Sequence, residues 1–187
     1  MSPSAPHLAI QRFNDHARSL GWLFALAPAG DFERPKLAQA FALWREKSAG
    51  RAMPPRADMS ARAMKAWMAN MSLLERIGEG RAARYRVRLH GSRLARYTSD
   101  KSGKYLDETV DRDDAQSYAA VYDLVLDQQY PVRLHIQYRA PAISYLIGES
   151  FVAPLARPDG GTPLILSVTF IKPRNEVVEP SVAGAHA

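Results

Sequence analysis

The sequence predicts an α+β fold, in which strand-like segments lie on either side of a helical insertion. Residues 84–90 and 132–138 alternate between apolar and polar side chains, the period-two pattern of a half-buried strand. Between these two segments, helical periodicity begins after Asp111, and two more strand-like segments follow residue 138. Strands, then a helical insertion, then further strands are typical of an α+β domain rather than of alternating βαβ units.

Composition narrows the classes of function. A chain of 187 residues with 47% hydrophobic and 24% charged residues suits one compact soluble domain with short appendages. The chain has no cysteine, which excludes disulfides, zinc–thiolate sites, iron–sulfur clusters and cysteine nucleophiles.

The charge balance is basic, with 25 Lys and Arg against 19 Asp and Glu. A net charge of +6 favours acidic partners such as nucleic acid or anionic lipid, but the basic residues are scattered and form no continuous run. Residues 81–104 are basic and residues 107–127 acidic, so the two stretches can attract one another within the domain. No stretch is long enough to span a membrane, and residues 20–27 follow a leader too charged for a signal peptide. We therefore expect a cytoplasmic protein.

Three helices are predicted in the first part of the chain. Residues 8–27 have apolar residues three and four positions apart, and their apolar end must be covered by the core or by a second subunit. Pro35 suits the first turn of a second helix. A third helix is predicted from the methionine-rich stretch before residue 71. The apolar stripe of the second helix consists of Leu37, Ala40, Phe41 and Trp44. That of the third helix consists of Met64, Trp67, Met68 and Met71.

The second part of the chain is predicted to be strand-rich. Strands are expected at residues 71–77, 83–90, 132–138, 145–155 and 164–171. After the second strand, Ser92 is predicted to cap a short helix, and Gly103 to make a turn that glycine adopts at low cost. Asp111 is predicted to cap a long helix that directs Tyr118, Val121, Tyr122 and Val125 inward.

The segment RYRVRLHGSRLARYTSDKSGKYLDE, residues 84–108, resembles the signature of the small stand-alone PAS-domain proteins common in alphaproteobacteria. An aromatic and basic strand ends in Gly-Ser, and a D-x-x-G-x-x-L turn follows with Asp100, Gly103 and Leu106. The resemblance continues at residues 51–61, 129–134 and 153–161, and thus covers roughly residues 35–173.

The resemblance implies a five-stranded antiparallel sheet whose connecting helices cover one face and enclose a pocket. In that fold the second and third strands lie at opposite edges, and N-terminal helices commonly pack on the open face or dimerise. The implied organisation is an N-terminal helical extension in residues 1–34, a PAS-like domain in residues 35–173 and a disordered tail in residues 174–187.

No motif in the sequence indicates a particular cofactor. It lacks the G-x-S-x-G and H-E-x-x-H motifs. Some PAS domains bind haem through a histidine on the long helix, but residues 111–128 contain none, and a cysteinyl-flavin adduct requires a cysteine. His90 and His135 fall on the polar sides of their strands and are predicted to point away from the pocket, so metal binding has no support.

Tyrosines cluster in the region that should wall the pocket: Tyr85, Tyr97, Tyr105, Tyr118, Tyr122 and Tyr145. Buried tyrosines need hydroxyl partners, so the cluster fits either a filled core with hydroxyls at the surface or a small-molecule pocket. Periodicity and the resemblance together imply these ligand-binding residues: Tyr85, Val87, Tyr97, Leu106, Tyr122, Leu134 and Phe151. Arg86, Gly91, Ser92 and Gly103 are predicted to form the structural frame.

The leading hypothesis is a non-enzymatic sensory or regulatory protein of bacterial signal transduction. It would bind a small ligand in the pocket, or a protein partner or a second copy of itself through its N-terminal helices and sheet face. One alternative is a nucleic-acid-associated regulator that uses the basic strand Arg84–His90, although exposed aromatic residues are missing from that face. The other is a small α+β enzyme, for which Glu149 is the only strand carboxylate to consider.

Overall fold

The structure is a computed structural model that describes residues 5–138 and 146–173. Its centre is a six-stranded sheet in which every neighbouring pair is antiparallel, in the order β1-β4-β5-β6-β2-β3. The strands are β1 (Phe24–Pro28), β2 (Met71–Ile77), β3 (Arg84–His90), β4 (Val132–Gln137), β5 (Leu146–Leu155) and β6 (Leu164–Pro173). The α+β prediction is thus confirmed, whereas the predicted count of five strands is wrong by one.

Four α-helices and four short 3₁₀ helices accompany the strands in the described part of the chain. The α-helices are α1 (Ala5–Ser19), α2 (Pro35–Ser48), α3 (Ser92–Thr98) and α4 (Arg112–Gln128). The 3₁₀ helices are η1 (Arg56–Asp58), η2 (Met68–Asn70), η3 (Gly80–Ala82) and η4 (Leu106–Glu108). The third predicted helix is absent: residues 61–67 form turns that lead into η2, and Met64, Trp67 and Met71 are still buried.

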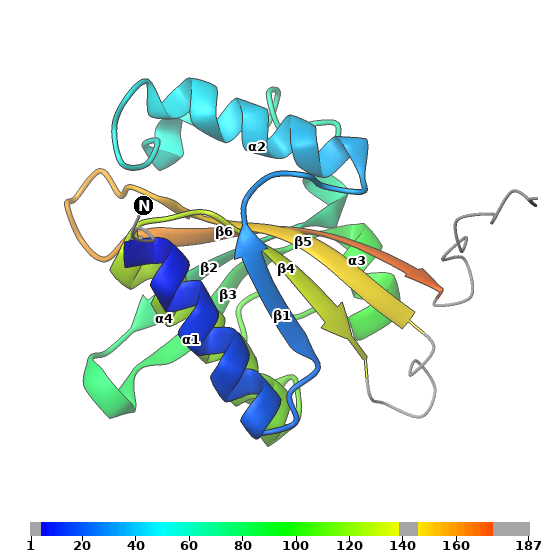
Figure 1. Cartoon of the computed structure of the whole chain (residues 1–187). Helices are drawn as coiled ribbons and strands as arrows, with labels where there is room; N and C mark the ends of the chain where they lie inside the picture. The colour runs from blue at the N-terminus through cyan, green and yellow to red at the C-terminus, as the bar shows by residue number, and fades with distance from the viewer. Residues whose placement is uncertain (1–4, 139–145, 174–187) are drawn as a thin grey trace, which may run out of the picture.

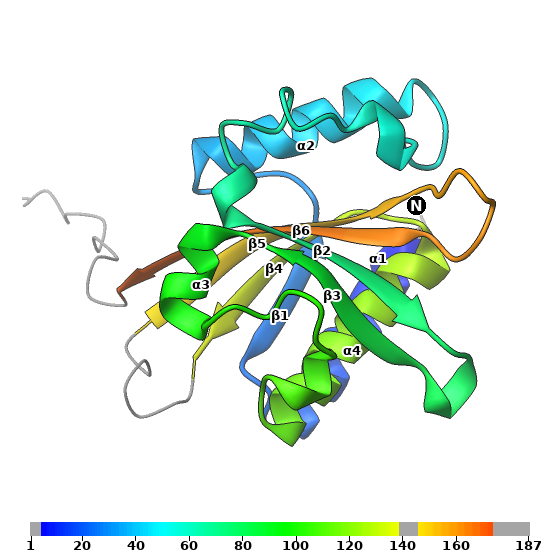
Figure 2. The ribbon, with the colours of Figure 1, turned by 180° about the vertical axis from the view of Figure 1, so that it is seen from behind.

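Helices cover both faces of the sheet. α1 and α4 lie side by side on one face, and α2 crosses the other (Figures 1 and 2). Each face has its own apolar core, one around Val121, Val125 and Leu134 and the other around Leu37, Trp67 and Phe151. The connecting helix α4 thus covers one face, as expected, and α2 buries its apolar stripe on the opposite face, where the resemblance places N-terminal helices.

The N-terminal segment contributes the additional strand. The helix predicted for residues 8–27 ends at Ser19, and Gly21 adopts a positive φ of 66° that turns the chain back. Phe24 and Leu26 are buried while Ala25 is exposed, so this short segment alternates as a strand and pairs with β4. The core therefore covers most of the apolar patch that the sequence left open to a second subunit.

The remaining strands follow the predicted arrangement. β3 is one edge of the sheet, and β4 would be the other if β1 were not added beside it. The capping prediction for Asp111 is confirmed, since its Oδ1 accepts a hydrogen bond of 2.8 Å from the Asp114 N–H. Ser92 is not a cap: Gly91 is the N-cap residue of α3, and no side chain caps that helix. Residues 174–187, the predicted disordered tail, lie outside the described residues.

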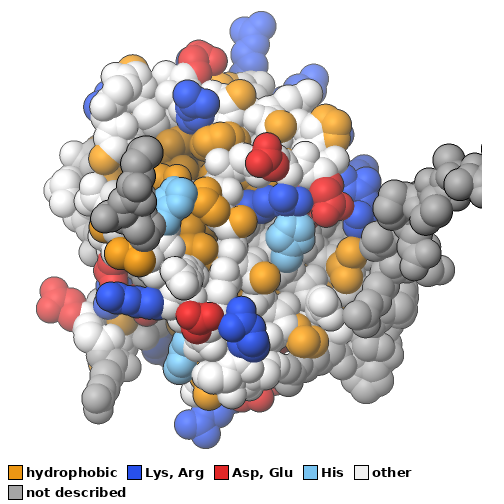
Figure 3. All heavy atoms as spheres, viewed as in Figure 1, with side chains coloured by type: hydrophobic (Ala, Val, Ile, Leu, Met, Phe, Trp, Pro, Cys, Tyr) orange, Lys and Arg blue, Asp and Glu red, His pale blue; other side chains and the backbone are white. Residues whose placement is uncertain are grey.

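Charged side chains of opposite sign are interspersed on the surface. On the face shown in Figure 3, basic and acidic groups of the described residues lie next to one another rather than in one continuous basic patch. Ion pairs such as Lys172–Glu33, at 2.8 Å, account for this mixing. No helix among the described residues is long and apolar enough to cross a membrane.

Candidate functional site

A cavity of about 60 Å³ lies between the sheet and the elements that follow β3. Its floor is formed by β2, β3 and β6, and its walls by α3, α4 and the loop between α3 and η4. We call it the central cavity. Its apolar lining consists of Leu74, Val87, Leu94, Leu106 and Ile171.

The floor of the central cavity is polar. Ser72, Ser167 and Thr169 project from neighbouring strands on the same face of the sheet. Ser150 of β5 lies beside them, and its Oγ is 2.8 Å from Thr169 Oγ1. These hydroxyls interrupt a face that is otherwise apolar, so the middle of this sheet carries hydrogen-bonding groups where a filled core would carry methyl groups.

His90 lines the central cavity, contrary to the prediction that it points away. The β2–β3 register shifts after Leu73, which pairs with Leu89, whereas Leu74 pairs with Val87. This bulge inserts Arg88 as an extra residue in β3 and reverses the alternation beyond it. Leu89 is consequently exposed and His90 turned inward.

The imidazole of His90 is held by two hydroxyl groups. Its Nδ1 is 2.9 Å from Ser72 Oγ, and its Nε2 is 3.1 Å from Thr98 Oγ1. Burial, together with the nearby positive charge of Lys101, lowers the pKa of His90, while Asp100 acts weakly in the opposite direction. The neutral imidazole therefore belongs to the hydrogen-bonded frame of the cavity.

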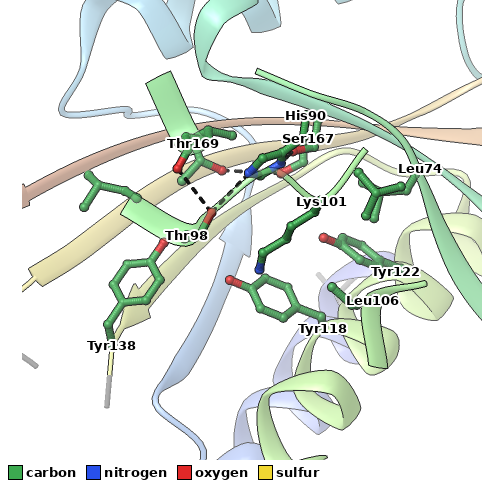
Figure 4. Close-up of a pocket in the computed structure, with 14 residues that line it drawn as sticks. Leu74, His90, Thr98, Lys101, Leu106, Tyr118, Tyr122, Tyr138, Ser167 and Thr169 are labelled. Atoms are coloured by element: carbon green, nitrogen blue, oxygen red, sulfur yellow. Dashed lines mark hydrogen bonds between the residues drawn. The ribbon is translucent and has the colours of Figure 1, made fainter. Parts of the chain in front are cut away.

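Three tyrosines bring hydroxyl groups to the cavity, two from α4 on the side opposite the floor and one from the end of β4. Tyr118 and Tyr122 project from one side of α4 with their rings stacked at 6.0 Å, and Tyr138 follows β4 (Figure 4). Burial raises the pKa of all three phenols above the ordinary value, so the hydroxyls remain protonated and can donate hydrogen bonds. The predicted inward direction of Tyr118 and Tyr122 agrees with this arrangement.

Lys101 reaches the cavity from the loop between α3 and η4. The residue is only 8% exposed, and its side chain extends toward the hydroxyls of Tyr118 and Tyr122 (Figure 4). Burial lowers the pKa of Lys101, and the more distant Asp114 offsets this only in part. A buried amine that extends toward two phenols is the main electrostatic feature of the cavity.

Three of the seven predicted ligand-binding residues line the central cavity: Val87, Leu106 and Tyr122. A fourth, Tyr85, lies just behind this wall. Its ring contacts that of Tyr122 with centroids 5.1 Å apart, and its hydroxyl donates to Asp123. Ligand binding by these residues remains a prediction, but the structure brings them together.

The other three predicted residues lie elsewhere. Tyr97 is 43% exposed on α3 and turns away from the cavity lining. Leu134 is buried in the core between β4 and the helices α1 and α4. Phe151 lies on the opposite face of the sheet, where it packs against Phe32 and Phe41. Apolar periodicity identifies buried positions, but it does not say which side of a sheet that is covered on both faces they occupy.

Several lining residues were not identified from the sequence. The hydroxyl floor could have been found, because Ser167 and Thr169 occupy alternate positions in an otherwise apolar strand, LILSVTFI. Lys101 carried no such signal, since a lysine in a polar loop is ordinarily exposed. Tyr138 ends the alternating segment 132–138 on its apolar side, but no site role was predicted for it. Tyr145, counted in the predicted tyrosine cluster, lies outside the described residues.

Glu149, the carboxylate considered for an enzyme, faces away from the central cavity. It accepts hydrogen bonds from the backbone N–H groups of Glu33 and Arg34 at 3.0 and 3.2 Å, just before α2 begins. Arg133 Nε donates to the same carboxylate at 2.7 Å. Glu149 thus holds the start of α2 against the sheet. No acidic side chain lines the central cavity within the described part of the chain.

The arginines of the basic strand β3 are bound to carboxylates of the same chain. Arg84 donates to Asp107 at 2.8 and 2.9 Å and to Glu108 at 2.9 Å, and its guanidinium lies over the Tyr105 ring. This contact confirms the predicted attraction between the basic and acidic stretches.

A third carboxylate binds the other two arginines of the strand. Arg86 and Arg88 both bind Glu75, whose side chain is 5% exposed, and Arg157 approaches it as well. Burial raises the pKa of Glu75, but the two strand arginines outweigh this effect and lower the pKa below its ordinary value. The strand is therefore internally compensated.

The described residues contain no group of three or more His, Asp or Glu side chains that could hold a metal ion. A family model described as a PAS domain matches residues 32–169, which is well over half of the chain. No curated protein matches the sequence.

Proposed function

Because the chain belongs to the PAS-domain family, whose members serve in sensing and signalling, we propose that it is a sensory or regulatory protein that binds a small molecule in the central cavity. The observation that carries this proposal is the cavity itself. It lies between the sheet and α4, and it combines a polar floor with an apolar wall. Such a combination fits a site that orients a ligand by a few polar groups and buries the rest.

The walls of the central cavity suggest how the effect of ligand binding would be transmitted to the surface. α3 and the following loop are short, and the side of this segment away from the cavity is exposed at Tyr97. A ligand that orders the loop or shifts α4 would change the surface offered to a partner. We propose that the signal leaves by contact with another protein or with a second copy of the chain.

PAS domains are in general non-enzymatic, and we propose the same for this chain, whose cavity lining among the described residues contains no carboxylate. A role in nucleic-acid binding has little support because the β3 arginines are engaged by Asp107, Glu108 and Glu75. The cytoplasm remains the predicted location, and the alphaproteobacterial, stand-alone character remains a prediction from the resemblance.

Native mass spectrometry of the purified protein, compared with its denatured mass, tests the proposal. We predict that the wild-type protein incubated with a metabolite extract carries additional non-covalent mass. Ser167→Leu should lose at least about nine-tenths of it, because the larger side chain enters a cavity of about 60 Å³.

The matched control is Val168→Leu, the next residue of β6, which lies in the core on the opposite face. It should retain the bound mass. An empty wild-type protein, or equal occupancy of the two variants, would contradict binding in the central cavity.

A further inference from the structure

Lys101 is unusual among the buried basic side chains of the described residues. Arg133 and Lys172, which are also largely buried, each have a carboxylate close by, Glu149 at 2.7 Å and Glu33 at 2.8 Å. Lys101 is 8% exposed and forms no ion pair within 4 Å with any described carboxylate. Burial of an uncompensated ammonium group is costly, so the site favours a negative charge from outside the chain.

The backbone fixes Lys101 in this position. The Gly103 N–H donates to the Val87 carbonyl at 2.7 Å, and the His90 N–H donates to Ser102 Oγ at 3.1 Å. Both contacts join the Lys101 loop to β3 immediately after the lysine. The side chain is therefore held against the cavity by its own loop and is not a surface lysine folded inward.

The groups around the ammonium of Lys101 suit a carboxylate. The hydroxyls of Tyr118, Tyr122 and Tyr138 line the same cavity, and burial keeps them protonated by raising the pKa of each. One cation and several neutral donors match the two oxygens of a carboxylate, which only accept hydrogen bonds.

The size of the central cavity and its apolar wall further restrict the class of anion that it can bind. A cavity of about 60 Å³ has room for about four or five water-sized groups. Leu74, Val87 and Leu106 form one side of it, and a purely polar anion such as phosphate would leave this side without contacts. A short aliphatic tail would cover it.

We infer that the central cavity selects short-chain aliphatic monocarboxylates, in the range of acetate to butyrate, with Lys101 as the anchor for the carboxylate. This inference rests on the proposed function, because it assigns a ligand class to the same cavity. Lys101 supplies the charge, the tyrosine hydroxyls orient the oxygens, and the leucines and Val87 contact the tail.

Titration of the ¹⁵N-labelled protein with butyrate and with butyramide, its neutral analogue, tests the inference by NMR. We expect butyrate to bind at least about tenfold more tightly than butyramide, the scale of one charge-assisted hydrogen bond. In Lys101→Met, which keeps the length of the side chain and removes its charge, the two affinities should agree within about twofold. Lys104→Met, a change at an exposed lysine of the same loop, should behave as the wild type does.

The possible outcomes separate the two proposals. If the wild type binds butyramide with the same affinity as butyrate, or binds phosphate more tightly than either, the carboxylate assignment is overturned. Binding of a small molecule in the cavity then still stands. If Lys101→Met keeps the preference for butyrate, the anchor is wrongly assigned. If neither probe binds and native mass spectrometry finds no other ligand, the proposed function fails together with the inference.

Discussion

At the scale of single residues, the central cavity depends on a local irregularity. Without the bulge at Arg88, Leu89 would enter the cavity and His90 would face solvent. The bulge instead places an imidazole between Ser72 and Thr98, so that the hydroxyls of β2 and α3 are joined through one side chain. A neutral histidine in this position also avoids adding a second positive charge beside Lys101.

We predict that stability decreases in mild acid, in part because of His90. Burial lowers its pKa below the ordinary value of 6.5, so the unfolded state takes up a proton more readily than the folded state does. The free energy of unfolding should therefore fall as the pH drops below about 6.5. Urea unfolding at about pH 7.5 and about pH 5 would measure this difference.

His90→Gln should reduce that pH-dependent difference while keeping hydrogen-bonding capacity toward the hydroxyls. His135 also has a pKa lowered by burial and by Arg133, so His135→Gln should independently reduce the pH-dependent difference in the free energy of unfolding. An unchanged difference in His90→Gln would mean that this imidazole is not kept neutral by the fold.

At the scale of elements, α1 and β1 form one unit that closes an edge of the sheet. The Asn14 side chain donates to the Leu26 carbonyl and accepts from the Leu26 N–H, both at 2.8 Å. One amide of α1 thus satisfies backbone groups of β1 that do not face β4. Edge strands with unpaired backbone groups invite association with other chains, and α1 blunts this edge at its centre.

Asn14→Ala should therefore loosen β1. We expect a loss of about 1–2 kcal/mol in the free energy of unfolding, for two backbone hydrogen bonds. Hydrogen exchange should also be faster at the Leu26 amide. Asp15→Ala, at an exposed neighbour whose carboxylate contacts Arg18, is the control and should change stability by less than about 0.5 kcal/mol. Equal exchange at Leu26 in both variants would argue against the edge-capping role of Asn14.

At the scale of the whole molecule, the net charge of +6 does not act as one basic surface. The arginines of β3 form ion pairs with Asp107, Glu108 and Glu75, and the face in Figure 3 carries both positively and negatively charged side chains. Attraction to a polyanion depends on clustered, uncompensated charges, which release many counterions together.

We predict only weak, non-specific nucleic-acid binding. Fluorescence anisotropy with labelled single- and double-stranded DNA should give no saturable binding at about 0.15 M salt and weak binding at most at about 0.02 M. Replacement of Arg84, Arg86 and Arg88 by alanine should leave the result nearly unchanged. Saturable binding at about 0.15 M salt that these replacements abolish would restore the nucleic-acid hypothesis.

The sequence by itself determined the elements whose signals are local. Alternation gave β3 and β4, Asp111 marked the start of α4, and helical spacing directed Tyr118 and Tyr122 to the inner side of that helix. These signals, together with the resemblance to the PAS family, predicted that Val87, Leu106 and Tyr122 meet at one pocket. Such patterns repeat within a few residues, so they can be recognised in the sequence without knowledge of long-range contacts.

Only the tertiary structure decided the features that depend on partners distant in sequence. β1 is a strand because β4 offers it an edge, and Phe151 faces away from the cavity because α2 covers that side. The bulge that turns His90 inward exists only in the pairing of β2 with β3. Lys101 looks like an ordinary loop lysine until the loop is joined to β3, and its burial is the feature from which the ligand class follows.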